Sequence, residues 1–168
     1  MLTDKQIDDI LKNIKIVVDT REQKNQHIIA YLNDNHIPYV VSKLDSADYS
    51  YLLPDYPQLN MDKKVLVEKK YGLNEITGNL TKGRKRFDAE FSRVDKDVSL
   101  HLVIEQTTWK KILNHSYLSK MTPKSLMASL LSFAERYNMK VWFVGKLESP
   151  EVIYNIIYYG LMNKLREV

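Results

Sequence analysis

Short apolar segments rich in β-branched and aromatic residues alternate along the chain with segments in which apolar residues recur at helical spacing. Runs of the first kind are typical of β-strands. Several of them hold apolar residues at consecutive positions, which indicates strands that are buried on both faces. The predicted strands cover residues 15–18, 39–44, 49–53, 65–68, 100–105 and 141–144.

Between these strands, apolar residues three or four positions apart predict amphipathic helices. The helical patterns lie around residues 28–32, 87–94 and 126–137. Thr122-Pro123 and Ser149-Pro150 each place a hydroxyl side chain before a proline, so we expect both hydroxyls to cap helices. Helices interleaved with strands in this way predict an α/β fold.

The segment from Ser46 to Val67 reverses direction within a short span. Asp48-Tyr49 opens one strand, the proline-containing stretch 53–57 interrupts it, and Val65 begins the next strand. This pattern predicts a hairpin with a long tip.

The length of 168 residues and the hydrophobic fraction of 44% suit one domain with a core of its own. We therefore expect a single domain over residues 1–168, in which residues 1–14 form an N-terminal helical extension. Cysteine is absent, which excludes a disulfide scaffold and a Cys-ligated zinc site. No stretch is long and apolar enough to cross a bilayer, and the first residues are polar, so we expect a cytoplasmic protein with no membrane association.

The formal net charge of +4 and the isoelectric point near 9.0 are too mild to establish nucleic-acid binding. The distribution of charge says more, because basic residues clearly outnumber acidic ones between Lys63 and Arg93. This segment is the first candidate for contact with a polyanion.

Acidic residues stand at the ends of the predicted strands. Asp19 and Glu22 follow the first strand, Asp48 enters the third, and Glu68 leaves the fourth. Carboxylates are ligands for hard cations such as Mg²⁺ and Mn²⁺. Such an ion neutralises charge on a phosphate and lowers the pKa of water, which are the two requirements for cleaving a phosphodiester.

In Glu68-Lys69-Lys70, strand alternation puts Glu68 and Lys70 on one face and Lys69 on the other. Lys70 would then stabilise an attacking hydroxide or negative charge on phosphorus beside a metal ligand. Lys69 would meet a flanking phosphate or solvent. An aspartate followed at a distance by Glu-x-Lys is the pattern of restriction-like nucleases, but it often arises by chance, and the alternative is a solvated strand edge that carries charges.

Four motifs together resemble the nuclease domain of the XPF type in their order and rough spacing. They are Ile-Val-Val-Asp-Thr-Arg-Glu at 16–22, Ser-Ala-Asp-Tyr at 46–49, Val-Glu-Lys-Lys at 67–70 and Leu-Thr-Lys-Gly-Arg at 80–84. From about Lys15 to the C-terminus, the chain is similar to compact stand-alone members of bacteria and bacteriophages. The resemblance implies a restriction-endonuclease-like fold of the PD-(D/E)XK superfamily, with a central mixed sheet flanked by helices.

The same resemblance assigns roles to the acids and to one lysine. It implies that Asp48 and Glu68 bind Mg²⁺ or Mn²⁺ and that Lys70 is the catalytic lysine. Asp19 and Glu22 would be additional acids of the active site, with Asp19 as a further metal ligand.

Three positions depart from the family pattern. Ala47 stands where the family has glycine, which requires only that the backbone there avoid a conformation specific to glycine. Lys69 replaces arginine and loses its bidentate fork for phosphate. The final aspartate of the motif falls on Asn74 or on Glu75. With Asn74 a charge is missing from the site, and with Glu75 a carboxylate is retained one residue further on, as another metal ligand.

A run of basic residues opens the helix predicted around residues 87–94. Backbone N–H groups at a helix start, together with nearby cations, predict a phosphate site for the DNA backbone. The alternative is a charged helix face, in which Arg84 pairs with Asp88 and Arg86 with Glu90. Arg21 would in addition hold the acids of the site in place. The residues expected to contact DNA are Arg21, Lys69, Lys82, Arg84, Lys85 and Arg86.

The predicted C-terminal helix, residues 149–166, is apolar nearly all round. A terminal helix with one buried face should show one polar face. The resemblance to XPF-type domains, which pair through their C-terminal helices, implies a homodimer; alternatively, the helix is wedged in the core. Trp109 is expected to begin a short helix and to pack, and the histidines show no metal-ligand spacing.

These expectations describe a metal-dependent endonuclease that cleaves DNA at branched or single-strand/double-strand junctions. Larger members of the family carry a tandem helix-hairpin-helix module, and we expect none in this chain. Two alternatives stay open. One is a non-catalytic DNA-binding or scaffold domain of the same fold, and the other is a junction resolvase or restriction-type nuclease, which differs only in its substrate.

Overall fold

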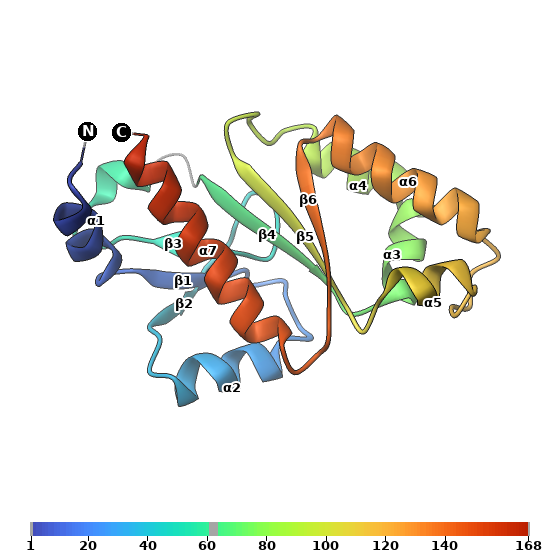
Figure 1. The fold of residues 1–168 in the computed structure, drawn as a ribbon, viewed down its shortest axis with the longest axis horizontal. Helices are drawn as coiled ribbons and strands as arrows, with labels where there is room; N and C mark the ends of the chain where they lie inside the picture. The colour runs from blue at the N-terminus through green and yellow to red at the C-terminus, as the bar shows by residue number, and fades with distance from the viewer. Residues whose placement is uncertain (1, 61–63, 168) are drawn as a thin grey trace.

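A six-stranded sheet runs through the middle of the molecule, and helices cover both of its faces (Figure 1). The computed structural model describes residues 2–60 and 64–167. The strands follow one another across the sheet in the order β2-β1-β3-β4-β5-β6. They are β1 (Lys15–Val18), β2 (Tyr39–Val41), β3 (Tyr49–Leu52), β4 (Val65–Lys70), β5 (Ser99–Glu105) and β6 (Met139–Val144).

The strand directions make the sheet mixed, which confirms the predicted architecture. β1 runs parallel to β2 and antiparallel to β3, β3 runs antiparallel to β4, and β4, β5 and β6 are parallel to one another. The β3–β4 pair is the predicted hairpin, and part of its tip, residues 61–63, lies outside the described residues.

Two strands end two or more residues away from the predicted position. β2 stops at Val41, because the chain beyond it turns so that the N–H of Leu44 reaches the carboxylate of Asp19 at 2.6 Å. β4 continues through Lys70, because it pairs with β5 over its whole length, up to Lys70 opposite Ile104. Glu68 and Lys70 therefore both lie inside a strand.

The helices divide between the two faces of the sheet (Figure 1). One face carries α1 (Asp4–Leu11), α2 (Gln26–Asp34) and α7 (Ser149–Arg166), and the other carries α3 (Leu73–Leu80), α4 (Arg84–Phe91), α5 (Trp109–Leu113) and α6 (Pro123–Arg136). A short 3-10 turn, Pro57–Leu59, lies within the β3–β4 connection. α5 begins at Trp109, as predicted, and the Trp109 ring packs edge-on against Phe143 at 4.8 Å.

Two hydrophobic cores result from this arrangement, one on each face of the sheet. Val67 and Val103 point into the core beneath α1, α2 and α7, whereas Leu66 and Leu102 point into the core beneath α3 to α6. The central strands are thus buried on both faces, as the consecutive apolar residues predicted. The buried residues Ile7, Ile10 and Leu11 make α1 part of the first core.

One of the two predicted helix caps is confirmed and the other is wrong. The Thr122 side chain accepts a hydrogen bond from the N–H of Ser125 and caps α6. Ser149 lies inside α7, and its hydroxyl donates to the buried carboxylate of Glu105 at 2.5 Å. The N-cap position of α7 lies one residue earlier than predicted, at Glu148, so Ser149 is the first helical residue and its hydroxyl lies within reach of Glu105 and of the carbonyl oxygen of Lys146.

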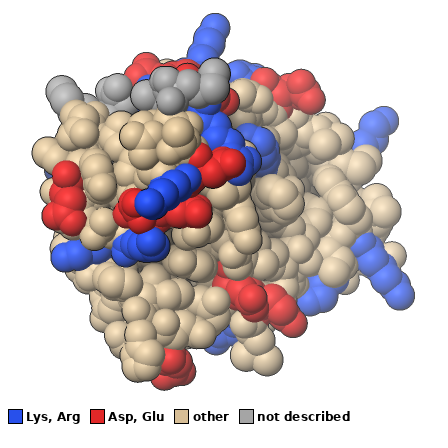
Figure 2. All heavy atoms as spheres, turned by 60° about the vertical axis from the view of Figure 1, so that its left-hand side comes forward, with Lys and Arg blue, Asp and Glu red and all other residues tan. Residues whose placement is uncertain are grey.

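Figure 2 shows the face that carries α1 and the C-terminal end of α7, where basic side chains lie beside acidic ones and much of the surface carries neither. This fits the mild net charge. Among the helices of residues 2–60 and 64–167, none combines the length and the apolar composition needed to cross a membrane.

Candidate active site

Three acids from three neighbouring strands meet at one end of the sheet. Asp19 follows β1 and Asp48 precedes the antiparallel β3, so that both stand at the same edge. The N–H of Asp19 donates to the carbonyl oxygen of Asp48 at 2.8 Å, and the N–H of Asp48 donates to that of Val67 at 3.0 Å. Glu68, the next residue of β4, is thereby brought to the same place.

A cavity of about 200 Å³ opens at this edge. Its walls come from the loop after β1, from the start of β3, from the end of β4 and from the first turn of α3. The residues that line it are Arg21, Glu22, Gln23, Lys24, Asp48, Lys69, Lys70 and Glu75. Glu68 contacts the cavity through Lys70, whose Nζ lies 2.5 Å from Glu68 Oε1.

Lys70 is an ammonium group surrounded by carboxylates. Burial alone would lower the pKa of Lys70, but the charges of Glu68 and Asp48 outweigh it and raise the pKa above its ordinary value. Glu75 Oε1 lies 3.9 Å away on the other side. Lys70 therefore keeps its positive charge at neutral pH and can donate hydrogen bonds into the cavity.

The surroundings of Asp48 and Glu68, in contrast, disfavour their charged forms. Burial raises the pKa of Asp48 well above its usual range, and the negative charge of Glu68 raises it further. Burial likewise raises the pKa of Glu68, against the opposing effect of Lys70. One N–H, that of Lys69, donates to Asp48 Oδ2 at 2.8 Å. The positive charge nearby thus compensates these two carboxylates only in part.

This donor set fits a divalent cation in its chemistry. Mg²⁺ and Mn²⁺ prefer carboxylate oxygens, and a cation would relieve the repulsion between two buried acids. Within the described parts of the chain, no group of three or more His, Asp or Glu side chains is already placed to hold a metal ion. Mg²⁺ usually retains several waters and takes only one or two carboxylates, so two side-chain ligands are sufficient for it.

Asp19 lies in a different setting from the metal ligand that the resemblance implies. Its Oδ1 accepts from the N–H and the Nε of Arg21 at 2.8 and 2.7 Å, and its Oδ2 accepts from Arg21 Nη2 and from the N–H of Leu44. Burial alone would raise the pKa of Asp19, but these hydrogen bonds outweigh it and lower the pKa. Asp19 and Arg21 therefore form a clamp that holds the loop after β1.

Lys69 does not meet solvent, so that part of the prediction is wrong. Its side chain is buried, with Nζ donating to the carbonyl oxygen of Lys24 at 3.0 Å and lying 3.7 Å from Glu22 Oε1. The loop that carries Glu22 and Lys24 folds over this face of β4. Strand alternation puts Lys69 opposite Glu68 as predicted, but the second face is covered as well.

The structure separates the two candidates for the last acidic position. Asn74 Oδ1 accepts a hydrogen bond from the N–H of Leu118 at 2.8 Å, away from the cavity. Glu75 lines the cavity, and its Oε2 accepts from the N–H of Tyr71 at 2.8 Å. Of the two, Glu75 is the carboxylate that faces Lys70.

Ala47 has a φ of +66°, so the expectation that its backbone avoids a glycine-like conformation is wrong. Residues other than glycine adopt this left-handed region at an energetic cost. The N–H of Ala47 donates to Glu90 Oε1 at 3.3 Å, and the neighbouring Asp48 is tied to β4 through its N–H. The strained residue thus directly precedes Asp48, and its conformation directs Asp48 into the cavity.

The basic run lies at the start of α4, outside the cavity. α4 begins at Arg84 after Gly83, with no capping side chain, and Lys82, Lys85 and Arg86 are exposed. The acids proposed as intrahelical partners have other contacts. Asp88 pairs with Arg136 at 2.9 Å and with Tyr137, and Glu90 with Ala47.

Sequence reasoning missed two acids near the site. The charge of Glu90 contributes to the raised pKa of Glu68, whereas the sequence pattern indicates Glu90 only as an intrahelical partner of Arg86. Glu105, at the end of β5, is fully buried and binds His27 Nε2 at 2.5 Å. Its place at the end of a strand beside β4 was the available signal.

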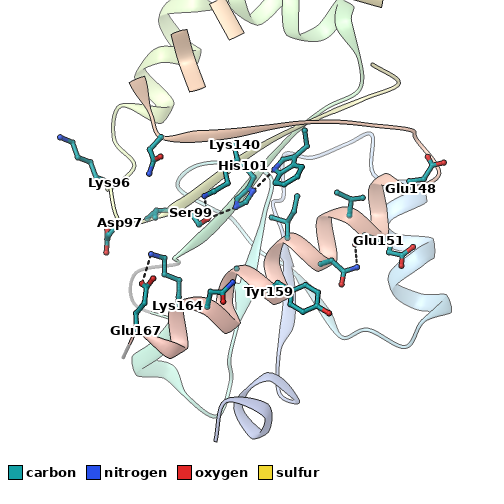
Figure 3. Close-up of a pocket in the computed structure, with 18 residues that line it drawn as sticks. Lys96, Asp97, Ser99, His101, Lys140, Glu148, Glu151, Tyr159, Lys164 and Glu167 are labelled. Atoms are coloured by element: carbon teal, nitrogen blue, oxygen red, sulfur yellow. Dashed lines mark hydrogen bonds and ion pairs between the residues drawn. The ribbon is translucent and has the colours of Figure 1, made fainter. Parts of the chain in front are cut away.

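A larger groove of about 860 Å³ lies elsewhere, between α7 and the β5–β6 edge of the sheet (Figure 3). It shares no lining residue with the acidic cavity. On its sheet side, Trp142 Nε1–H donates to His101 Nδ1 at 2.9 Å, and burial lowers the pKa of His101 to about 4. His101 is therefore neutral at physiological pH.

Comparison with known proteins identifies the family and the fold. Residues 18–156 match the family model of the ERCC4 domain. Two solved structures share the fold with a TM-score of 0.62 and 18% sequence identity: XPF from Aeropyrum pernix, and XPF from Aeropyrum pernix in complex with DNA. Each match covers 86% of this chain and 60% or 64% of the other, so the chain spans less than two thirds of their length. No curated protein matches the sequence.

Proposed function

Because this chain belongs to the ERCC4 domain family, we propose that it is a divalent-metal-dependent endonuclease that hydrolyses phosphodiester bonds of DNA. We propose branched DNA or a single-strand/double-strand junction as its substrate. One observation carries the proposal. Asp48 and Lys70 line one cavity, and Glu68 lies directly behind it with Oε1 2.5 Å from Lys70 Nζ, so that an ammonium group stands beside two undercompensated carboxylates.

Asp48 and Glu68 would hold a Mg²⁺ or Mn²⁺ ion, and Glu75 or Glu22 at the rim of the same cavity would complete its shell directly or through water. When bound, such an ion neutralises charge on the scissile phosphate and makes water a better nucleophile near neutral pH. The remaining chemistry is that of the protein side chains.

Lys70 has two tasks in this account. In the free protein it offsets part of the negative charge of Glu68. With DNA bound, its ammonium group donates a hydrogen bond to the attacking oxygen or to a non-bridging phosphate oxygen, where negative charge grows in the transition state. Its raised pKa means that it acts as a donor and not as a proton acceptor.

Asp19 and Arg21 act by positioning. Their clamp holds the loop after β1, which contributes Glu22 and Lys24 to the cavity. Lys69 fastens the other end of this loop through the carbonyl oxygen of Lys24. The cavity thus keeps its shape although its carboxylates repel one another.

The exposed cations at the start of α4 are the proposed grip on the DNA backbone outside the cavity. Arg21, which is more than half exposed, can contribute a further contact at the rim. That a relative of the same fold has been solved in complex with DNA supports this substrate class.

The proposal is tested by incubating the protein with labelled flap, fork, four-way junction, duplex and single-stranded DNA, each with Mg²⁺, Mn²⁺ or a chelator. Metal-dependent cutting of the flap or fork is the expected result. Binding without cutting of any substrate would favour the scaffold function. Cutting of the four-way junction alone, or of duplex at a defined sequence, would favour the resolvase or the restriction-type nuclease.

We also propose a homodimer through α7. The side of this helix that lines the groove of Figure 3 carries the half-buried Val152 and Ile156 and the exposed Tyr159, and Trp142 of the edge strand β6 lines the same groove. An apolar helix face next to an open sheet edge is a typical association surface. Sedimentation analysis is expected to give a dimer for the wild type and a monomer for Ile156→Glu. A monomeric wild type would contradict this part.

A further inference from the structure

Beside the acidic cavity lies a second hollow that no role so far described uses. Its volume is about 500 Å³, and it shares Gln23 and Lys24 with the acidic cavity, so the two hollows lie side by side. The walls are the loop after β1, the first turn of α2, the link between β4 and α3, and the link between β6 and α7. The lining residues are Gln23, Lys24, Gln26, His27, Tyr71 and Lys146.

Tyr71 is the aromatic centre of this hollow and directly follows Lys70. Its N–H donates to Glu75 Oε2 at 2.8 Å, and its carbonyl oxygen accepts from Gln106 Nε2 at 3.2 Å. The backbone of Tyr71 is therefore held on both sides, and its ring is only half-buried. A partly exposed ring on an anchored backbone can accept a flat partner with little loss of conformational entropy.

Two ammonium groups gather around that ring. Lys24 Nζ lies 5.1 Å and Lys146 Nζ 5.3 Å from the ring centroid of Tyr71. The lining contains no Asp or Glu, in contrast to the acidic cavity next to it. Two exposed cations drawn to one ring make a local excess of positive charge, which favours an anion between them.

Beneath the hollow, hydrogen bonds to Glu105 connect three elements, α2, α7 and β5. His27 of α2 and Ser149 of α7 both contact Glu105 Oε1, each at 2.5 Å, at the end of β5. Glu105 is fully buried, so its charge lies beneath the surface that a ligand would meet. The first turn of α2, which carries Gln26, and the link before α7, which carries Lys146, are thereby tied to the end of β5.

An aromatic ring, flanking cations and neutral amides are the combination that binds a nucleotide: the ring takes a base, the cations take a phosphate, and the amides take the base edge. We infer that this hollow binds one unpaired nucleotide of the DNA strand next to the bond being cut. The base stacks on Tyr71, the phosphate lies between Lys24 and Lys146, and Gln23 and Gln26 flank the base. The inference rests on the proposed endonuclease function and specifies its substrate as DNA with a single-stranded segment at the site.

The most direct test is a photochemical cross-link that needs no catalysis. A single-stranded oligonucleotide with 5-iodouracil is bound to the full chain in chelator and irradiated, and the adduct is mapped by mass spectrometry. The expected adduct is on the peptide that contains Tyr71. Bound DNA that cross-links only elsewhere, for example at Trp142, would overturn the inference.

Affinities supply the second test, by fluorescence anisotropy of labelled oligodeoxythymidine in chelator. Tyr71→Leu is expected to weaken binding about tenfold, because stacking of one base is lost, whereas Tyr71→Trp keeps wild-type affinity. Lys146→Ala is expected to lower the slope of log affinity against log salt by about 0.7, for one phosphate contact on a single strand. Tyr117→Leu and Lys5→Ala, a half-buried tyrosine and an exposed lysine outside the hollow, serve as matched controls and should leave binding unchanged.

Blunt duplex of the same length separates stacking from general attraction. Tyr71→Leu should change duplex affinity by less than about twofold, because paired bases are not available for stacking. Equal losses for duplex and single strand, or no loss for either, would overturn the inference, and a melting curve checks that the variant is folded. If the Tyr71 adduct forms but no DNA in the substrate panel is cut, the endonuclease proposal fails and the nucleotide site stands. If the DNA is cut at the same rate with and without the Tyr71 ring and no Tyr71 adduct forms, the nucleotide site fails and the endonuclease proposal stands.

Discussion

Two kinds of acid meet at one end of the sheet and are held in opposite ways. The carboxylate of Asp19 accepts hydrogen bonds on both oxygens from Arg21 and from the N–H of Leu44, which lower its pKa. Loss of solvent raises the pKa of both Asp48 and Glu68, and the charge of Glu68 raises that of Asp48 further. The first acid therefore stabilises the fold, whereas the other two cost stability, and a bound cation, as proposed, would complete the partial compensation that Lys70 provides.

The largest expected effect is on cleavage. Glu68→Gln and Asp48→Asn should each lower the rate about a thousandfold or more, because each removes a charged ligand of the ion that supports the reaction. Initial rates on labelled fork DNA measure this, with Asp34→Asn, an exposed aspartate at the end of α2, as the matched control. A Glu68→Gln protein with wild-type rates would remove Glu68 from the mechanism.

The clamp is expected to show the next largest effect, on folding. Asp19→Asn should lower the free energy of unfolding at neutral pH by about 2 kcal/mol, since Arg21 and the N–H of Leu44 lose a charged acceptor. A carboxyl group with a lowered pKa contributes stability above the pKa of the unfolded chain and loses it as the pH falls through the folded value. The difference from wild type should therefore shrink toward pH 3.

Urea denaturation at pH 7 and pH 3 measures this difference. Asp9→Asn is the matched control, because Asp9 forms an exposed ion pair with Lys12 at 2.7 Å, and such pairs contribute little. A difference that stays constant over this pH range would show that Asp19 does not stabilise through its charge.

The proposed metal ligands should affect stability in the opposite sense. In chelator at neutral pH, Asp48→Asn is expected to raise the free energy of unfolding by about 1 kcal/mol, because a buried, undercompensated charge is removed. The raised pKa means that the wild type bears this cost above the folded pKa of Asp48 and loses it as the pH falls below that value, so the gain should vanish in acid. Destabilisation by Asp48→Asn at neutral pH would break the contrast with Asp19.

The smallest expected effect concerns the residue that directs Asp48 into the cavity. Ala47→Gly should raise the free energy of unfolding by roughly 0.5 kcal/mol, since relief of the left-handed conformation exceeds the entropic cost of glycine. Ala128→Gly, on the exposed side of α6, should lower it by about 1 kcal/mol. Two changes of the same sign would contradict the strain at Ala47.

Much of the fold and the meeting of the acids were predictable from the sequence, for a common physical reason. Each strand carries its own apolar run, and alternation along β4 alone puts Glu68 and Lys70 on one face. Interactions between distant segments were not predictable. Lys69 is buried because a loop 45 residues earlier in the chain folds over it. Ser149 does not cap a helix, because its hydroxyl donates to Glu105 on β5.

Whether Asn74 or Glu75 faces the cavity could not be predicted from the sequence either. It depends on the loop after α5, whose Leu118 N–H binds Asn74 and holds it away from the cavity. The φ of Ala47 depends on the contact of its N–H with Glu90, more than forty residues later. Local pattern predicts the elements, whereas the details of the site arise where the elements meet.

The central claim is that Asp48 and Glu68 form a cation site, and uptake of Mn²⁺ by the protein without DNA tests it most directly. Titration followed by the electron paramagnetic resonance signal of free Mn²⁺ should show binding to the wild type and to Asp34→Asn. Binding to Glu68→Gln should be at least about tenfold weaker. Equal uptake of Mn²⁺ by the wild type and by Glu68→Gln would contradict the claim.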